Sequence, residues 1–254
     1  MNLTRAIEQS YFDHIRSMAI RRHVDAGNLE YIHTGLKLHN RVFNARLEGN
    51  FDPQVLELIQ RFDLWRVPLI WDVSPSSRPA DLGQHLERFG FVRRAELLGM
   101  GLELSGLRPA PLPQGVSLEP VTEANFDMWS KVIALANGLP RTRMAMFQKI
   151  YEPTLRMPRW RHFLALAEGT PAATCSLLAP APEASDPALG VYWVATAPKF
   201  QRQGLASGVV SRLLEACCSL SWAVLHSTPE GLEIYRRLGF ADDLPYTVYM
   251  RQLR

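Results

Sequence analysis

The residues best suited to chemistry form a glycine-containing turn between a predicted strand and a predicted helix, within residues 190–206. The strand is predicted from the β-branched and aromatic residues 191–194 and ends before Pro198. The helix is predicted from apolar residues that recur every four positions, namely Leu205, Val209, Leu213 and Cys217. A helix that begins near Gly204 presents backbone N–H groups without intrahelical partners, which suit an anion such as a pyrophosphate. The small residues Gly204 and Ala206 leave these donors accessible.

A glycine turn after a strand also occurs as a purely structural cap, so the turn alone does not separate the two interpretations. The residues that follow supply context. A second short strand is predicted at 221–226 and a second helix at 229–238, and this helix contains Tyr235 and precedes Gly239-Phe240.

This order of elements, with the signature Gln201-x-x-Gly204-x-Ala206, resembles the GNAT superfamily of acyl-CoA N-acyltransferases over about residues 116–254. The resemblance implies an α+β (α/β) fold in which a mixed, mostly antiparallel central sheet is flanked by helices. It also implies acetyl-CoA as the co-substrate, no metal, and direct attack of a primary amine on the thioester. The acceptor, a small-molecule amine or a protein amine, is not identified by the signature.

The resemblance further implies where the coenzyme binds. The pantetheine arm pairs with the backbone of the strand before the signature, and the pyrophosphate binds the amides of the turn, with a charge-assisted contact from Arg202. The predicted coenzyme-binding residues are Val194, Ala195, Thr196, Arg202, Gln203, Gly204, Leu205, Ala206 and Ser207.

Tyr235 is the general acid that the resemblance implies, donating a proton to the departing thiolate. A phenol is neutral at pH 7 and can give up its proton to a developing negative charge. Leu232, Tyr235 and Leu238 also have the spacing of a buried helical face. A packing role for Tyr235 therefore stays open.

A general base is harder to assign, because residues 190–196 lack the glutamate that many GNAT relatives carry on this strand. Either the base lies elsewhere or the acceptor arrives neutral. Glu168 is expected in a hairpin turn with Gly169, and Glu152 and His226 remain candidates, although a histidine at a strand end is often structural. The missing carboxylate also leaves open a second class of function, a non-catalytic acyl-CoA-binding regulatory or scaffold protein.

The first half of the chain repeats the end of the second. Residues 86–91 are similar to residues 235–240, which lie 149 positions later. The first copy is preceded by a predicted strand at 67–71 and followed by one at 98–104. The second copy is preceded by a predicted strand at 222–226 and followed by one at 247–253. This pattern predicts a tandem of two GNAT-like domains. Leu86 replaces Tyr235, and no phosphate-binding turn occurs before residue 66. We therefore expect a degenerate, non-catalytic N-terminal half with residues 28–44 as a substrate-facing segment, and one coenzyme site per chain.

The proline-rich segment 108–115 marks the predicted domain division, with domains at 1–107 and 116–254 joined by this linker. A chain of 254 residues that is 47% hydrophobic can form two cores. After the linker, Thr122 is expected to cap a helix that ends at Asn137-Gly138 and buries Phe126, Trp129, Val132 and Ile133. Earlier, Asp52-Pro53 is expected to open a helix that buries Leu56, Ile59 and Phe62.

The global composition mainly excludes other classes. No run approaches the ~18 apolar residues of a membrane helix, and the first residues do not resemble a signal peptide, so a cytoplasmic protein without a membrane partner is expected. The three cysteines, Cys175, Cys217 and Cys218, suggest neither disulfides nor zinc, and the adjacent pair is expected to pack on a helix. A net charge of +3 with short arginine doublets does not indicate nucleic-acid binding. Both a monomer and a homodimer are compatible with the sequence.

Overall fold

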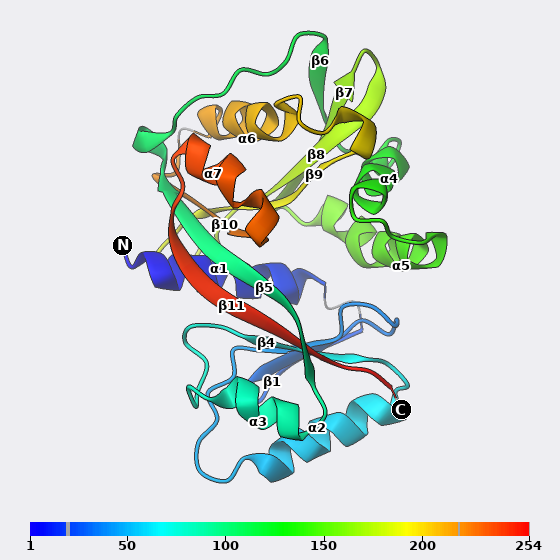
Figure 1. The fold of residues 1–254 in the computed structure, drawn as a ribbon, viewed down its shortest axis with the longest axis vertical. Coiled ribbons are helices and arrows are strands. Elements are labelled where there is room, and N and C mark those ends of the chain that lie inside the picture. The colour runs from blue at the N-terminus through cyan, green and yellow to red at the C-terminus, as the bar shows by residue number, and fades with distance from the viewer. Residues whose placement is uncertain (19–20, 218, 254) are drawn as a thin grey trace. The chain divides into compact units, whose positions relative to one another are not determined.

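The computed structural model describes residues 1–18, 21–217 and 219–253. The chain forms two compact units: unit 1 comprises residues 1–11 and 99–243, and unit 2 comprises residues 12–98 and 244–254. Three elements pass from one unit to the other, α1 (Leu3–Ser17), β5 (Val92–Glu103) and β11 (Ala241–Arg251) (Figure 1). The predicted sequence domains, 1–107 and 116–254, remain a prediction. The compact units do not have the same boundaries as these sequence domains. The reason is that β5, from the first half of the sequence, ends in unit 1, and β11, from the second half, ends in unit 2.

Unit 1 contains a mixed sheet with the strand order β5-β10-β9-β8-β7-β6. Strands β6 to β9 pair antiparallel, whereas β9 and β10 pair parallel. The hairpin between β7 and β8 turns at Glu168 and Gly169, both with positive φ, which confirms the turn predicted there. The further strands of this sheet are β6 (Val116–Pro120), β7 (Trp160–Ala167), β8 (Thr170–Leu178), β9 (Leu189–Thr196) and β10 (Trp222–Ser227).

Helices cover both faces of this sheet. Successive residues of a strand point to opposite faces, so alternate residues of β8 contact different helices. Cys175 and Leu177 of β8 pack in the core with α6 (Leu205–Glu215) and α7 (Leu232–Leu238). The intervening Ser176 contacts His162, whose ring packs on Trp129 of α4 (Phe126–Ala136). Figure 1 shows α6 and α7 on one side of β8 and β9, and α4 and α5 (Arg141–Tyr151) on the other. The 3-10 turns of this unit are η1 (Leu104–Gly106), η2 (Glu152–Arg156), η3 (Pro198–Phe200) and η4 (Pro229–Gly231).

Two helix boundaries differ from the prediction. Helix α6 begins at Leu205 as expected but ends at Glu215, so Cys217 lies beyond the helix that was predicted to include it; Cys218 lies outside the described residues. Helix α4 begins at Phe126 rather than after Thr122, because the side-chain Oδ1 of Asn125 accepts a hydrogen bond from the Thr122 N–H at 2.7 Å and holds those residues in a turn. The predicted buried face of α4 is confirmed, as is its end at Asn137-Gly138.

The proline-rich segment 108–115 packs along α6 within unit 1. The Ala110 N–H donates to the Ser211 hydroxyl at 3.0 Å. Gly208, in the first half of α6, lies so close to this segment that an added Cβ would be 2.6 Å from the Pro111 carbonyl oxygen. The segment is therefore part of the packed unit as well as a connection in the sequence.

Unit 2 contains a sheet with the strand order β1-β2-β3-β4-β11-β5. Strand β11 pairs antiparallel with β4, from Thr247 opposite Val73 to Arg251 opposite Leu69. Helix α2 buries Val55, Leu58, Ile59 and Phe62, whereas Leu56, predicted to be buried, is 45% exposed because it lies one position off this face. The remaining elements are β1 (Arg22–Asp25), β2 (Glu30–His33), β3 (Arg41–Phe43), α2 (Asp52–Leu64), β4 (Leu69–Val73) and α3 (Leu82–Arg88).

The two halves of the sequence share the predicted order of strand, helix and strand. The order is β4, α3 and β5 in the first half and β10, α7 and β11 in the second. Each helix is followed by a glycine with positive φ, Gly90 in one case and Gly239 in the other. Leu86, which occupies the position of Tyr235, is fully buried.

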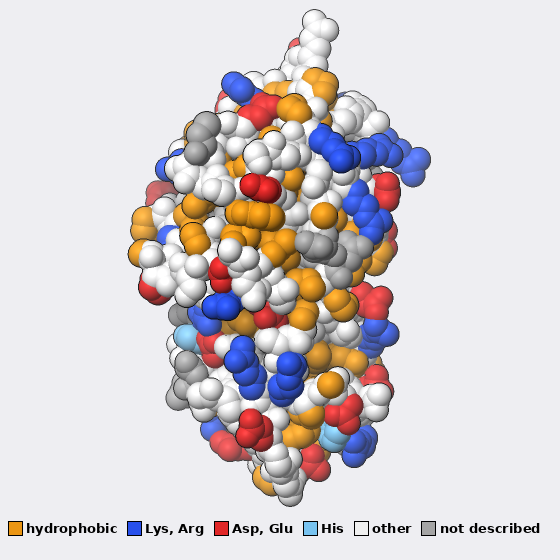
Figure 2. Space-filling model, turned by 90° about the vertical axis from the view of Figure 1, so that its left-hand side faces the viewer, with side chains coloured by type: hydrophobic (Ala, Val, Ile, Leu, Met, Phe, Trp, Pro, Cys, Tyr) orange, Lys and Arg blue, Asp and Glu red, His pale blue; other side chains and the backbone are white. Residues whose placement is uncertain are grey.

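No helix in residues 1–18, 21–217 and 219–253 is both long and apolar enough to cross a membrane. On the face shown in Figure 2, basic and acidic side chains are interspersed.

The contact between α6 and the proline-rich segment can be tested with Gly208→Val. The added side chain would meet the backbone at Pro111 and Leu112, and we expect a loss of about 1–3 kcal/mol in the free energy of unfolding, measured by urea denaturation. Gly106→Val is the matched control, because no atom lies within 4 Å of a Cβ added at Gly106. Equal stability of the two variants would contradict the packing described here.

Candidate functional site

A β-bulge interrupts the pairing of β8 and β9. Thr174 lies opposite Ala195 and Ser176 opposite Tyr192, so two residues of β9, Trp193 and Val194, face only one residue of β8. Trp193 has a φ of 51°, and its carbonyl oxygen accepts a hydrogen bond of 2.7 Å from the Thr174 hydroxyl. A bulge bends its strand and increases the local twist.

Strand β9 also separates from β10 at this point. Their parallel pairing extends from Leu189 opposite Ala223 to Val191 opposite Leu225 and includes no later residue of β9. Residues 192–196 therefore pair with β8 on one side only. The predicted coenzyme-binding residues Val194, Ala195 and Thr196 lie in this segment, and Ala195 is the most buried of the three.

The turn between β9 and α6 forms the second part of the site. Arg202 and Gly204 both adopt positive φ, 60° and 78°. The side-chain amides of Gln201 and Gln203 donate to the carbonyl oxygens of Thr196 and Lys199, at 3.1 and 3.2 Å, and these bonds close the turn. Residues 201–204 are exposed.

The backbone N–H groups of this turn are available as donors. The first helical hydrogen bond of α6 runs from the Gly208 N–H to the Gly204 carbonyl oxygen at 2.9 Å. Within the described residues, the N–H groups of residues 202–207 have no protein acceptor. A Cβ added to Gly204 would meet no atom within 4 Å. The turn thus combines consecutive free donors, the positive end of a helix dipole and open space, the properties of an anion site.

Tyr235 lies in α7 and is 9% exposed. Its ring belongs to the core cluster beneath α6 and makes an edge contact with Phe240, with 5.9 Å between ring centroids. Burial raises the pKa of the phenol, and the nearby Cys175 thiol adds to this effect. Tyr235 therefore remains protonated at neutral pH.

The two base candidates have different surroundings. His226 lies within β10, and its ring centroid is 4.4 Å from that of Tyr11. Burial lowers the pKa of His226 to about 3, so its imidazole is neutral and a weak base at pH 7. Glu152 is exposed at the end of α5.

The part of the chain that the structure describes holds no group of three or more His, Cys, Asp or Glu side chains arranged for a metal ion.

A buried aromatic and polar cluster behind the bulge was not anticipated from the sequence. The Trp193 ring packs edge-on against Phe147 and Tyr151 of α5, with centroid separations of 5.0 and 4.6 Å. Its members come from separate elements, and the local signal in the sequence is limited to the four-residue spacing of Phe147 and Tyr151. The cluster supports β9 from the side opposite α6.

His162 is the polar centre of that cluster. The Thr154 hydroxyl donates to the Tyr151 carbonyl, so it accepts from the His162 Nε2–H at 2.8 Å, and the Ser176 hydroxyl donates to Nδ1 at 2.7 Å. These partners assign the Nε2–H tautomer. Desolvation lowers the pKa of His162 to about 4.

These features define a class of protein. The mixed sheet, the separation of β9 from β10 and the turn that suits an anion occur together in the fold of GNAT N-acetyltransferases. A GCN5-related N-acetyltransferase from Kribbella flavida aligns with a TM-score of 0.68 and 20% identity over 95% of both chains. A functionally unknown conserved protein from Staphylococcus epidermidis aligns with a TM-score of 0.70 and 11% identity, over 91% of this chain and 93% of the other. A tandem GNAT protein from the clavulanic acid biosynthesis pathway aligns with a TM-score of 0.60 and 14% identity, over 88% and 78%. At these identities the similarity shows the fold.

A family of known sequences also matches part of the C-terminal half. Residues 158–242 match the family described as acetyltransferase (GNAT) domain. The matched residues lie from just before β7 to the start of β11. No curated protein sequence matches the chain.

The His162 cluster gives a pH-dependent prediction. The pKa of His162 is below its ordinary value of 6.5 in the folded protein, so unfolding takes up a proton between about pH 4 and 6.5, and stability falls as the pH drops through this range. His162→Gln should remove this contribution and flatten the dependence by up to about 1.4 kcal/mol per pH unit. Urea denaturation of both proteins from pH 4 to 7.5 measures the difference. Parallel curves would show that His162 is not held neutral by the fold.

Proposed function

We propose that the protein transfers an acetyl group from acetyl-CoA to a primary amine and binds the coenzyme along residues 194–196 and in the turn before α6. The observation that carries this proposal is the row of unpartnered N–H groups at residues 202–207, beside the open space at Gly204. The GNAT match over residues 158–242 supports the general class, an acyl-CoA-dependent N-acyltransferase.

The turn suits the pyrophosphate of the coenzyme. Its N–H groups can donate to several phosphate oxygens, and the exposed Arg202 guanidinium adds a positive charge. Gly204 keeps the donors within reach because no side chain covers them. Leu205 is buried and anchors the start of α6, while Ala206 and Ser207 are half-buried beside the donors.

The free backbone edge of β9 suits the pantetheine arm. Residues 192–196 are outside the ladder with β10, so the backbone edge on that side can pair with the amide groups of an extended ligand. The bulge at Trp193 lies in the same segment. The thioester is therefore expected beside the bulge.

In the proposed reaction, a neutral amine attacks the thioester carbonyl, the carbon–sulfur bond breaks, and sulfur leaves with the electron pair. We assign the proton for this thiolate to the Tyr235 hydroxyl, whose raised pKa keeps it protonated until the negative charge develops. The ammonium form of the acceptor must lose one proton before attack. After attack the nitrogen loses a second proton, which leaves a neutral amide and restores the Tyr235 hydroxyl that protonated sulfur. No base is assigned, because β9 lacks a carboxylate and His226 is a weak base.

A non-catalytic acyl-CoA-binding protein is the second candidate. Two observations favour it: no carboxylate in β9, and the packing of Tyr235 inside the core cluster. Release of free thiol on incubation with acetyl-CoA and a panel of amines separates the two candidates. Turnover with any acceptor excludes the second.

The coenzyme turn can be tested with Gly204→Asn. Asparagine tolerates positive φ, so the turn should persist while its side chain fills the space over the donors. We expect affinity for coenzyme A to fall about tenfold or more, measured by calorimetry. Gly138→Asn is the matched control, since Gly138 also has positive φ and open surroundings. Wild-type stoichiometry should be one coenzyme per chain, and unchanged affinity in folded Gly204→Asn would place the coenzyme elsewhere.

The role of Tyr235 can be tested with Tyr235→Phe, which keeps the ring contact with Phe240 and removes the hydroxyl. Turnover should fall by ~10² to 10⁴ while coenzyme affinity and the thermal midpoint change little. Tyr249→Phe, in the part of β11 that packs in the core of unit 2, is the matched control and should retain full turnover. Normal turnover with a lowered midpoint in Tyr235→Phe would instead assign Tyr235 to core packing.

A further inference from the structure

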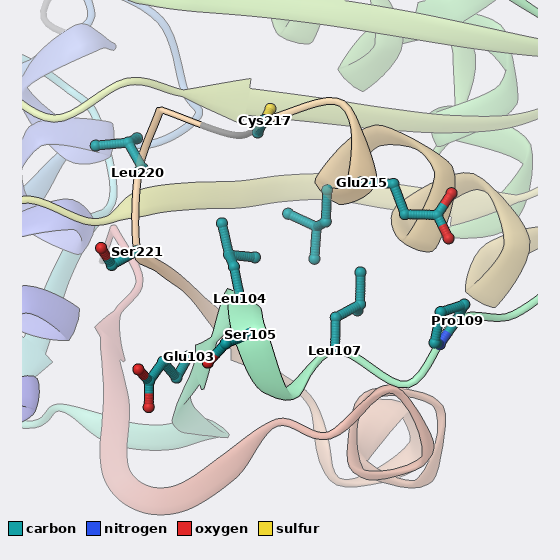
Figure 3. Close-up of a pocket in the computed structure, with 10 residues that line it drawn as sticks. Glu103, Leu104, Ser105, Leu107, Pro109, Glu215, Cys217, Leu220 and Ser221 are labelled. Atoms are coloured by element: carbon teal, nitrogen blue, oxygen red, sulfur yellow. The ribbon is translucent and has the colours of Figure 1, made fainter.

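Unit 1 contains a cavity of about 470 Å³ at the C-terminal end of α6. It is separate from the proposed coenzyme turn, because Gly204 and Leu214 are ten positions apart along α6, which corresponds to roughly 15 Å. The lining residues come from the end of β5, η1, the following proline-rich segment, the end of α6 and the loop before β10 (Figure 3). Its volume is in the range of small-molecule sites.

The floor of the cavity is apolar. Leu104, Leu107, Cys217 and Leu220 are half-buried and pack on the main core of unit 1, and Leu214 is part of that core. The side chains of Leu104 and Leu107 point into the space between the strand end and α6 (Figure 3). This is a place where the hydrophobic core reaches solvent, and an apolar ligand body of matching size would cover it.

The charge around the cavity is negative. The lining residues include two carboxylates, Glu103 and Glu215, and no Lys or Arg. Glu215 is partly offset by Arg212, whose Nη1 lies 3.9 Å from its carboxylate, whereas Glu103 is exposed. The last carbonyl groups of α6 also point toward its C-terminal end and add the negative pole of the helix dipole. A cation is therefore favoured over an anion here.

We infer that this cavity binds an amphipathic organic cation, a molecule with an apolar body and one ammonium group. The apolar body would cover Leu104, Leu107 and Leu220, and the ammonium group would lie at the rim near Glu103. The hydroxyls of Ser105 and Ser221 line the same cavity and can accept hydrogen bonds from an ammonium N–H. The inference does not depend on the acetyl-transfer reaction.

The test uses three probes that share an eight-carbon chain: octyltrimethylammonium, octanoate and 1-octanol. Octyltrimethylammonium has no N–H, so it cannot be acetylated and reports binding alone. Calorimetric titration of the full-length protein should give the tightest binding for octyltrimethylammonium. Equal binding of all three probes, preference for octanoate, or binding of none would overturn the inference.

Variants locate the binding. Glu103→Gln together with Glu215→Gln should weaken octyltrimethylammonium about two- to fivefold and leave 1-octanol unchanged, as expected for partly exposed charges. Glu119→Gln, an exposed position of β6 outside the cavity, is the matched control and should have no effect. Leu107→Trp should fill the cavity and abolish binding of the cation. Wild-type affinity in both the double variant and a folded Leu107→Trp would place the cation elsewhere and overturn the inference.

Discussion

The site of this protein depends on one extra residue in β9 relative to β8. The bulge gives Trp193 a positive φ, bends the strand, and coincides with the end of its pairing to β10 after Val191. A regular β9 would continue its parallel pairing with β10, and its backbone N–H and C=O groups on that edge would bond to β10. Because β9 departs, its last residues keep one free edge and lead directly into the turn before α6. The two parts of the candidate coenzyme site, the free edge of β9 and the turn, therefore follow one another directly in the chain.

Packing on both faces of the sheet supports that irregular strand. On one side, α6 and α7 form a core cluster with alternate residues of β8 and β9. On the other, the Trp193 ring is held by α5, and His162 bonds to hydroxyls of two separate elements. A residue in the left-handed region costs about 1–3 kcal/mol and persists only where its surroundings fix it. The aromatic contacts of Trp193 supply this constraint.

The sequence repeat and the compact units are organised differently. In each half, a strand, a helix and a second strand follow in order, as the sequence indicated. The second strand of each half then extends into the unit formed mainly by the other half: residues 244–251 of β11 complete the sheet of unit 2, and residues 99–103 of β5 belong to unit 1. Neither half of the sequence holds all the strands of its own unit. A boundary drawn at the prolines therefore cannot separate the two units.

The sequence by itself determined the local elements and the turn. The start of α6 just after Gly204, the hairpin at Glu168-Gly169 and the order of elements around Tyr235 follow from glycine geometry and the spacing of apolar residues, which act over a few positions. Only the tertiary structure decided the bulge at Trp193 and the path of β11 into unit 2. These features depend on the register between segments distant in sequence, and one apolar strand pattern is compatible with several partners. The same reason explains why the His162 cluster appeared only in the fold.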